Sequence, residues 1–140
     1  MANTQAISGI MKQVALGAVV DGKTLKAALY LASATTNGTN TAYTATGEVS
    51  GTNYSAGGVS VTNANSAGLT STTAYWTPSA SIAFTTVTLS TAFDAVMIYS
   101  TTDSNRNLGV YTFGSQTITA GTFTLTMPTN DSSTGLIRFA

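Results

Sequence analysis

The hydrophobic pattern of the chain has a helical period near the N-terminus and a strand period over the rest. Between residues 4 and 16, apolar side chains recur at the i, i+3, i+4, i+7 spacing of an amphipathic helix. They are Ala6, Ile7, Ile10, Met11, Val14 and Ala15, and the opposite face carries Gln5, Ser8, Lys12 and Gln13. Asn3 or Thr4 is a suitable N-cap, and Gly17 is a suitable C-terminal stop. The pattern predicts a single N-terminal helix.

This helix has two interpretations. In the first, it covers one end of a sheet and its apolar face belongs to the core. In the second, it is an assembly helix that packs against a neighbouring subunit. The residues that would make the assembly contact are then Ile7, Ile10, Met11 and Val14.

From residue 24 onward the period is two, which is typical of strands. The predicted strands are "TLKAALYLASA", "GGVSVTN", "TTAYWTP", "SIAFTTVTLS", "AFDAVMIYS", "LGVYTFG", "GTFTLTMP" and "GLIRFA", with "TTDSNRN" and "SQTITA" as connections. "AFDAVMIYS" is apolar on both faces and is expected to be central. The alternation shifts phase between Phe84 and Val87, which indicates a β-bulge.

About eight short strands at this spacing favour an antiparallel β-sandwich, or a barrel-like variant of it, over a βαβ fold. The fold class is therefore mainly β, with one N-terminal amphipathic helix. The predicted organisation is a helical segment, residues 1–17, that forms part of one unit with a single β-domain, residues 18–140.

Composition excludes several function classes. Only 7% of the 140 residues are charged and the net charge is zero, so no nucleic-acid binding is expected. Threonine, with 28 copies, makes the surface polar without charge. The absence of cysteine and histidine removes disulfides, the commonest metal ligands and the commonest general base. No apolar run is long enough to span a membrane, and Lys12 interrupts the apolar N-terminus, so no secretion signal is expected.

The remaining candidate chemistry is sparse. The carboxylates are Asp21, Glu48, Asp94, Asp103 and Asp131, and nothing in their spacing pairs them for acid–base catalysis. Asp103-Ser104-Asn105 begins like a calcium loop, but the later ligands are missing, which favours a turn. Trp76 is expected in the core rather than on a sugar-binding surface. No catalytic, cofactor-binding or metal-binding residue is predicted, and no cofactor.

The segment "TGEVSGTNYSAGGVSVTN", residues 46–63, is rich in glycine. A phosphate-binding loop would need a following helix and usually a lysine, whereas a strand follows here. The segment is therefore predicted to be a structural turn, in which glycines adopt positive φ and Glu48 accepts hydrogen bonds from nearby backbone N–H groups. Tyr54 is expected to pack on the sheet or a neighbouring chain. The turn residues are Gly47, Glu48, Gly51, Tyr54, Gly57 and Gly58.

The same segment resembles a motif of small β-rich structural proteins of tailed bacteriophages. In these proteins a Glu-Val-x-Gly turn precedes an aromatic residue, a small residue and paired glycines before a strand. The resemblance extends over the order of the segments from about Met11 to Phe113. Members often carry Arg-Gly-Ala before the "VMIYS"-type strand, where this chain has Phe93-Asp94-Ala95. The resemblance implies a β-domain on a capsid or tail and carries over no catalytic or cofactor residue.

Composition and resemblance together predict a non-enzymatic structural protein of a phage virion, made in the host cytoplasm. The expected role is that of a head decoration (cement) protein that binds and stabilises the capsid lattice. Its expected partners are the major capsid protein or other virion proteins, with copies forming a homo-oligomer or bound to the lattice. The alternatives are a tail, neck or fibre module that contacts the host surface, and a carbohydrate-binding β-sandwich module.

Overall fold

The computed structural model describes residues 3–140, so the first two residues of the predicted segment 1–17 lie outside the described residues. The described chain has one helix and seven strands, and every strand pairing is antiparallel. The elements are α1 (Gly9–Val20), β1 (Leu25–Leu31), β2 (Val59–Val61), β3 (Gly68–Thr70), β4 (Thr73–Trp76), β5 (Ile82–Ser100), β6 (Arg106–Leu125) and β7 (Ile137–Phe139). The mainly β class with an N-terminal helix is thus confirmed.

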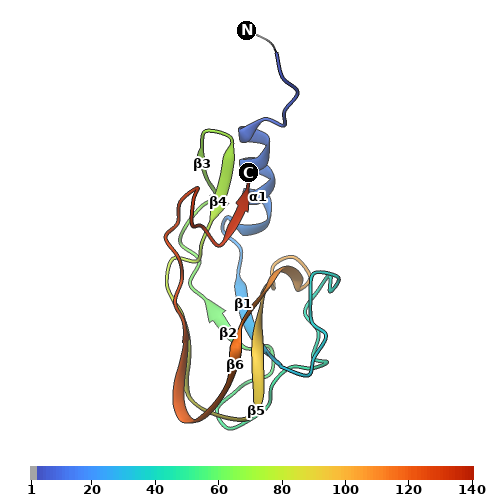
Figure 1. Cartoon of the computed structure of the whole chain (residues 1–140), viewed down its shortest axis with the longest axis vertical. Coiled ribbons are helices and arrows are strands. Elements are labelled where there is room, and N and C mark those ends of the chain that lie inside the picture. The colour runs from blue at the N-terminus through green and yellow to red at the C-terminus, as the bar shows by residue number, and fades with distance from the viewer. Residues whose placement is uncertain (1–2) are drawn as a thin grey trace.

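The strands form two sheets, and neither closes into a barrel. The larger sheet has the order β2-β1-β5-β6 and the smaller one the order β3-β4-β7. Helix α1 packs on the smaller sheet, at the upper end of the molecule in Figure 1. The larger sheet occupies the lower part of the same view.

Strands β5 and β6 form one long hairpin that is folded back on itself. Their pairing shifts register at five places, and each extra residue bends the ladder. Thr86 and Ala120, which lie where the two paired strands fold over, adopt positive φ, at 53° and 45°. One of the shifts lies between Phe84 and Val87, which confirms the predicted bulge. Figure 1 shows the resulting curve of both strands at the bottom of the molecule.

Aromatic rings fill the inside of this fold. Phe113 and Phe123 lie ten positions apart on β6, yet their ring centroids are 5.1 Å apart. The buried ring of Phe93 meets both of them edge-on, at 6.0 and 5.1 Å. The two halves of the hairpin, here called its arms, are therefore two layers that share one core. The first arm of β6 comprises residues 106–113 and the second arm residues 118–125.

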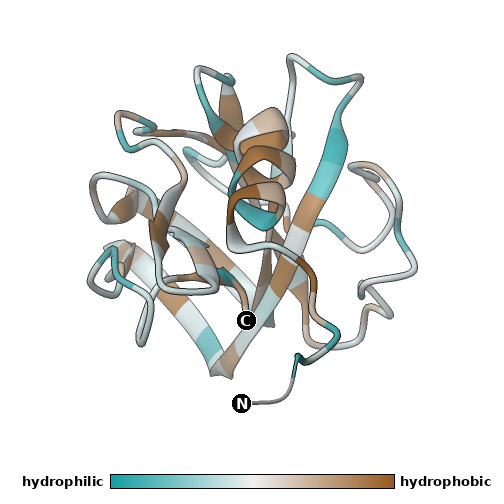
Figure 2. Cartoon of the chain, turned by 90° about the horizontal axis from the view of Figure 1, so that it is seen from above, coloured by the Kyte–Doolittle hydropathy of each residue, from teal (hydrophilic) through white to brown (hydrophobic). Residues whose placement is uncertain are grey.

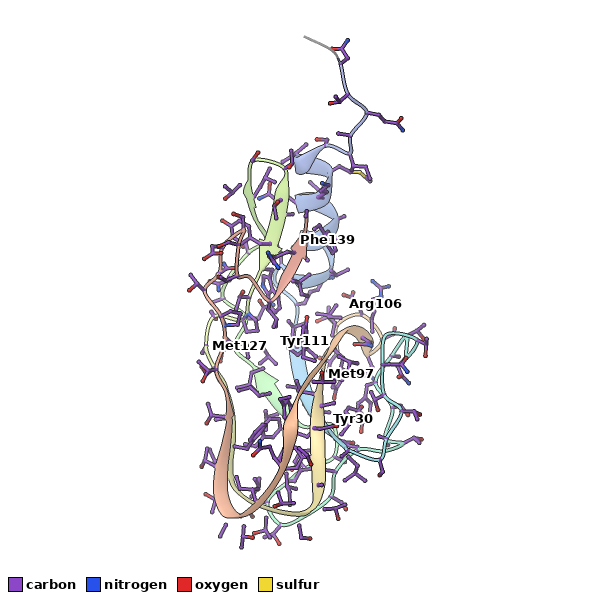
Figure 3. The ribbon with its side chains drawn as sticks, in the orientation of Figure 1. Tyr30, Met97, Arg106, Tyr111, Met127 and Phe139 are labelled. Atoms are coloured by element: carbon purple, nitrogen blue, oxygen red, sulfur yellow. The ribbon has the colours of Figure 1, made fainter. Side chains whose placement is uncertain are left out.

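Strand β1 is central and is buried on both faces. Leu25, Ala27 and Leu29 belong to the main core, while Ala28 and Tyr30 belong to a smaller cluster on the other face. The smaller cluster also contains Met97, and Figure 3 shows Tyr30 and Met97 close together. Tyr43, from the loop after β1, packs against this smaller cluster.

Several predicted boundaries were wrong. The segments "SIAFTTVTLS" and "AFDAVMIYS" are one continuous strand, and "SQTITA", predicted as a connection, lies inside β6. The described residues form seven strands, close to the predicted number of about eight, and one of them, β3, was not predicted. The errors in β5 and β6 share a cause: bulges change the phase of a strand without ending it, so a bent strand is easily mistaken for two strands.

Candidate functional site

The outward face of helix α1 is apolar. Four apolar side chains on or just before the helix have more than half of their area exposed. They are Ile7 (60%), Ile10 (59%), Met11 (60%) and Val14 (65%). Hydrophobic residues make up most of α1 when the molecule is seen from above (Figure 2). These four residues are called the apolar stripe below.

The helix contacts its own sheet through other residues. Leu16 and Val20 are fully buried. The Lys12 ammonium donates to the Thr72 carbonyl at 3.2 Å, and the Gln13 amide donates to the Ala67 carbonyl at 2.9 Å. Of the predicted polar face, Lys12 and Gln13 therefore contact the sheet, whereas Gln5 and Ser8 are exposed. The burial of Leu16 and Val20, together with these polar contacts, sets the rotation of the helix and leaves the apolar stripe outside.

The bounds of the helix also differ from the prediction. It begins at Gly9, after Ser8 rather than after Asn3 or Thr4, and it continues past Gly17 to Val20. Gly17 lies inside the helix, and a β-carbon there would come within 2.7 Å of the Asp21 carboxylate. That carboxylate accepts the Ala67 N–H at 2.7 Å. The glycine therefore makes room for a contact between the helix and the sheet instead of ending the helix.

The predicted turn at residues 46–63 is built around the Glu48 carboxylate. One oxygen accepts the Tyr43 hydroxyl at 2.6 Å, and the other accepts the Tyr54 hydroxyl and the Gly57 N–H, both at 2.8 Å. The expectation of backbone donors is met by one N–H only. The two phenols were not predicted. Glu48 thus connects two parts of the turn, Tyr54 and Gly57, to Tyr43 in the loop before it.

Tyr54 connects this turn to the core. Its ring stacks on Phe84, with centroids 6.0 Å apart, which confirms that it packs on the sheet. Its hydroxyl accepts the Leu29 N–H at 2.9 Å while it donates to Glu48. Val49 N–H donates to the Leu29 carbonyl at 3.0 Å. The turn therefore completes the edge of β1 beyond the end of the short strand β2.

Tyr30, Tyr43 and Tyr99 surround the same carboxylate. Tyr30 donates to the Thr44 carbonyl at 2.7 Å, and Tyr99 donates to the Gly57 carbonyl at 2.7 Å. The rings of Tyr43 and Tyr99 stack with centroids 4.8 Å apart. Removal of the phenol from water is the main cause that raises the pKa of Tyr30 to about 12. The same cause, with the negative charge of Glu48, raises the pKa values of Tyr43, Tyr54 and Tyr99.

The glycines of the turn serve two different needs. Gly47, Gly57 and Gly58 adopt positive φ, as predicted, whereas Gly51 does not. Gly51 is required because a β-carbon there would overlap the Thr88 carbonyl. At Gly58 both reasons apply, since φ is 75° and a β-carbon would overlap the Ala27 carbonyl. The prediction for Gly51 was right about the residue and wrong about the cause.

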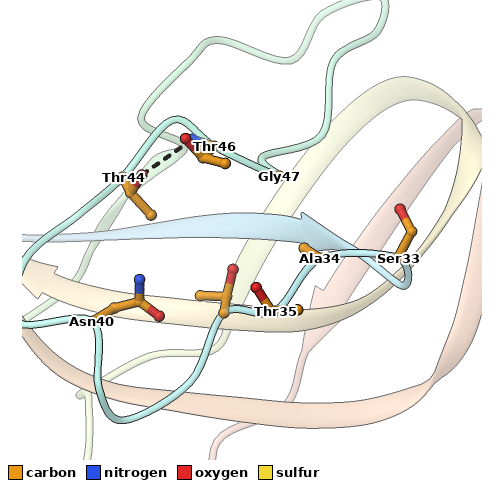
Figure 4. Close-up of a pocket in the computed structure, with 8 residues that line it drawn as sticks. Ser33, Ala34, Thr35, Asn40, Thr44, Thr46 and Gly47 are labelled. Atoms are coloured by element: carbon orange, nitrogen blue, oxygen red, sulfur yellow. Dashed lines mark hydrogen bonds between the residues drawn. The ribbon is translucent and has the colours of Figure 1, made fainter.

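A polar depression of about 490 Å³ lies beside this turn (Figure 4). It is lined by Ser33, Ala34, Thr35, Thr36, Asn40, Thr44, Thr46 and Gly47. The Thr46 N–H donates to the Thr44 hydroxyl at 3.2 Å across its rim. The lining offers hydroxyl, amide and backbone groups. It has no aromatic ring for a sugar to stack on and no side chain that titrates.

Asp21, Glu48, Asp103 and Asp131 each make local structural contacts. Asp103 pairs with Lys23 at 3.1 Å in the turn between β5 and β6, and the hydrogen bond from Lys23 lowers its pKa. Donors from Thr134 and Ser133 hold the pKa of Asp131 at about 2. Within residues 3–140 no three acidic side chains gather as a metal site would require. Trp76 is fully buried, as predicted.

Comparison of the chain with protein-family models, with curated proteins and with solved structures gives no match to any of them. The likeness to phage structural proteins therefore stays a prediction. Within residues 3–140, no helix is both long and apolar enough to cross a membrane.

Sequence reasoning missed the tyrosines that surround Glu48. Tyr30 and Tyr99 come from β1 and β5, and Tyr43 comes from the loop between β1 and β2. The only signal was that Tyr30 and Tyr99, whose hydroxyl groups can form hydrogen bonds, lie in strands that are apolar on both faces. Which carboxylate they would surround depends on the path of the loop, and the pattern does not encode that path.

Alanine substitutions separate the two needs for glycine. Gly58→Ala combines positive φ with an overlap and should cost about 2–5 kcal/mol, and Gly51→Ala should cost about 1–3 kcal/mol from overlap alone. Gly22→Ala is the matched control, because Gly22 has φ of 64° but open space around it, and it should lose only about 1–2 kcal/mol. Urea unfolding, with and without phosphate, measures all three. Wild-type stability of Gly51→Ala and Gly58→Ala, together with loss of an anion effect, would indicate a ligand loop instead.

Alkaline pH should destabilise the protein. The unfolded chain releases its phenolic protons near pH 10, whereas Tyr30 and Tyr111 hold theirs to about 12. This stabilisation is complete below pH 10 and is lost as pH rises toward 12, by up to about 1.4 kcal/mol per pH unit for each tyrosine. Urea unfolding between about pH 8 and pH 11 measures it. In Tyr111→Phe the loss should be shallower, and equal stability at both ends of this range would refute the expectation.

Proposed function

We propose that the protein is a non-enzymatic structural protein of a phage virion, a head decoration (cement) protein that binds and stabilises the capsid lattice. The observation that carries the proposal is the apolar stripe of α1. A helix that turns its lysine and glutamine toward its own sheet and its isoleucine, methionine and valine outward is arranged for contact with another protein. The proposed partner is the major capsid protein or another virion protein.

The chemistry of the stripe fits such a contact. None of its four residues is charged, and the nearest cation on the helix, Lys12, is engaged with Thr72. Interfaces are depleted of charge at their centre and exclude water there. The stripe alone is short, because α1 has 12 residues and rises about 1.5 Å per residue. A lattice position, where several neighbours contribute contacts, suits a short apolar surface better than a single isolated partner does.

A non-catalytic role is supported by the placement of the polar groups. Glu48 is occupied by three donors, and the polar depression beside it contains no acid or base. We also take the two arms of the folded hairpin, with the core between them, as the two layers of a β-sandwich. A carbohydrate-binding module needs an exposed ring on which the sugar can stack; Trp76 cannot supply it because it is buried, and Phe139 is exposed over 41% of its area. A tail, neck or fibre module would differ in its copy number in the particle.

Val14→Lys should separate folding from binding. Val14 is exposed, so the change should alter the free energy of unfolding by no more than about 0.5 kcal/mol. It should weaken co-sedimentation of the purified protein with heads of the phage that encodes it, by at least about tenfold in Kd. Thr39→Lys is the matched control. Thr39 is exposed in the loop after β1, and its substitution adds the same charge away from α1.

Salt provides a second measure on the same heads. Because the stripe is uncharged, binding should change little between about 0.05 and 0.5 M salt. Undiminished binding of Val14→Lys, or release of the wild-type protein by salt alone, would exclude the stripe as the contact. The absence of the chain from purified particles would exclude the virion role itself.

A further inference from the structure

The first arm of β6 is an open sheet edge. β6 is the last strand of the larger sheet and pairs only with β5. The segment around Ala42 covers its start, with a bridge from Ala42 to Arg106 and a bond from the Asn107 N–H to the Thr41 carbonyl. From Leu108 onward, the described residues give this edge no backbone partner. Six residues, 108–113, therefore present an unpaired row of backbone groups.

The hydrogen bonds of β1 show which groups point outward. Leu29 directs its N–H to Tyr54 and its carbonyl to Val49, away from β5. Leu29 is opposite Val96 on β5. Opposite residues of an antiparallel pair either bond to each other or both point away, so the backbone groups of Val96 point to β6. Val96 is opposite Tyr111, whose groups consequently point back to β5. Because backbone groups alternate in direction along a strand, the N–H and carbonyl groups of Val110 and Thr112 face outward.

This edge lacks the features that keep a free edge unpaired. Soluble proteins commonly guard such edges with lysine, proline or inward-pointing charges. Among the 20 residues of β6 only Arg106 is charged, and none is lysine or proline. Strand β2, at the other edge of the sheet, has only three residues. The larger sheet thus has one short edge and one long, uncharged edge.

An apolar slot of about 150 Å³ runs beside the open edge, on the core side of the sheet. Tyr111 and Phe113 line it from the first arm, and Leu125 and Met127 line it from the second arm and the segment after it. Figure 3 shows Tyr111 and Met127 on these two parts of the chain. These side chains are half-buried. The core is therefore incompletely covered along the same line where the sheet is incompletely paired.

We propose that a second copy of this chain pairs with the open edge, β6 to β6, in antiparallel orientation about a two-fold axis at Tyr111. Val110 then pairs with Thr112 of the second copy, and both outward N–H groups of each copy find carbonyl acceptors. The two four-stranded sheets become one sheet of eight strands, order β2-β1-β5-β6-β6-β5-β1-β2.

The strand itself is suited to this partner. Two-fold pairing matches a surface with itself, and an edge without charge has nothing to repel its own copy. In this register Arg106 is opposite Gln116 of the second copy, so the two guanidinium groups do not face each other. The axis is perpendicular to the sheet, which places both slots on one side, where the two Tyr111 rings cover each other. A closed dimer of this kind leaves no long edge free.

Sedimentation velocity of the full chain over a wide range of concentration tests this pairing. The wild-type protein should form a dimer. Thr112→Pro removes an outward N–H without removing a bond to β5 and should raise the dimer Kd by at least about tenfold, because each dimer loses two hydrogen bonds. Thr112→Ala keeps the N–H and is the matched control, for which the Kd should stay within a few-fold of wild type.

Hydrogen exchange of the wild-type protein decides the matter should Thr112→Pro fail to fold. The amides of Val110 and Thr112 should become more protected as the protein concentration rises. A wild-type protein that is monomeric throughout, or amides whose exchange is independent of concentration, would overturn the inference. So would a dimer that Val14→Lys disrupts and Thr112→Pro does not, since the contact would then be α1. None of these readouts uses phage heads, so the pairing and the proposed function succeed or fail separately.

Discussion

The contact of aromatic rings inside the folded β5–β6 hairpin is the interaction on which the rest of the structure depends. Folding over is favourable for a hairpin of this length only when both arms bury apolar surface against each other. Phe93 touches Phe113 and Phe123 at once, and Phe84 lies 6.3 Å from Phe123. Aromatic pairs of this geometry add about 0.5–1.5 kcal/mol each beyond the area they bury. The bulges let the strands bend, and the rings make the bent form stable.

The turn around Glu48 depends on this core. Phe84, placed by the bend, provides the surface on which Tyr54 stacks, and Tyr54 in turn donates to Glu48. A carboxylate that is half-buried needs donors, and two phenols and one backbone N–H supply them here. A protein with so few charges thus uses one of its five acidic residues to organise the longest irregular part of the chain. Polar side chains elsewhere, such as Asn63 beneath Trp76, satisfy buried backbone and indole groups in the same way.

The parts of the fold that follow local rules were predictable. Alternation located β1, β4 and both arms of the hairpin, and the phase shift at Phe84 and Val87 located a bulge. The continuity of β5 and β6 was not predictable, because it depends on rings that meet across ten residues of one strand. The rotation of α1 was not predictable either. Its period was right, but the carbonyls of Thr72 and Ala67 receive Lys12 and Gln13, and no helical pattern records where such acceptors lie.

Of the candidate sites, the residues were easier to predict than their reasons. The stripe Ile7, Ile10, Met11 and Val14 was identified as a possible contact surface from spacing alone, and all four are exposed. Gly51 was identified as structurally required, but through φ rather than through its closeness to Thr88. The open edge of β6 had no counterpart in the sequence, because strand order is a property of the whole sheet.

The folded hairpin can be tested directly by NMR on the isotope-labelled protein in solution. The rings of Phe113 and Phe123 should give mutual nuclear Overhauser effects, because their centroids lie 5.1 Å apart. In a straight strand the same residues would be separated by roughly 33 Å, ten steps of about 3.3 Å, far beyond the range of the effect. Cross-peaks between the two rings, and from each of them to Phe93, are the expected result. Their absence, in a protein whose β5–β6 pairing is otherwise intact, would contradict the folded hairpin.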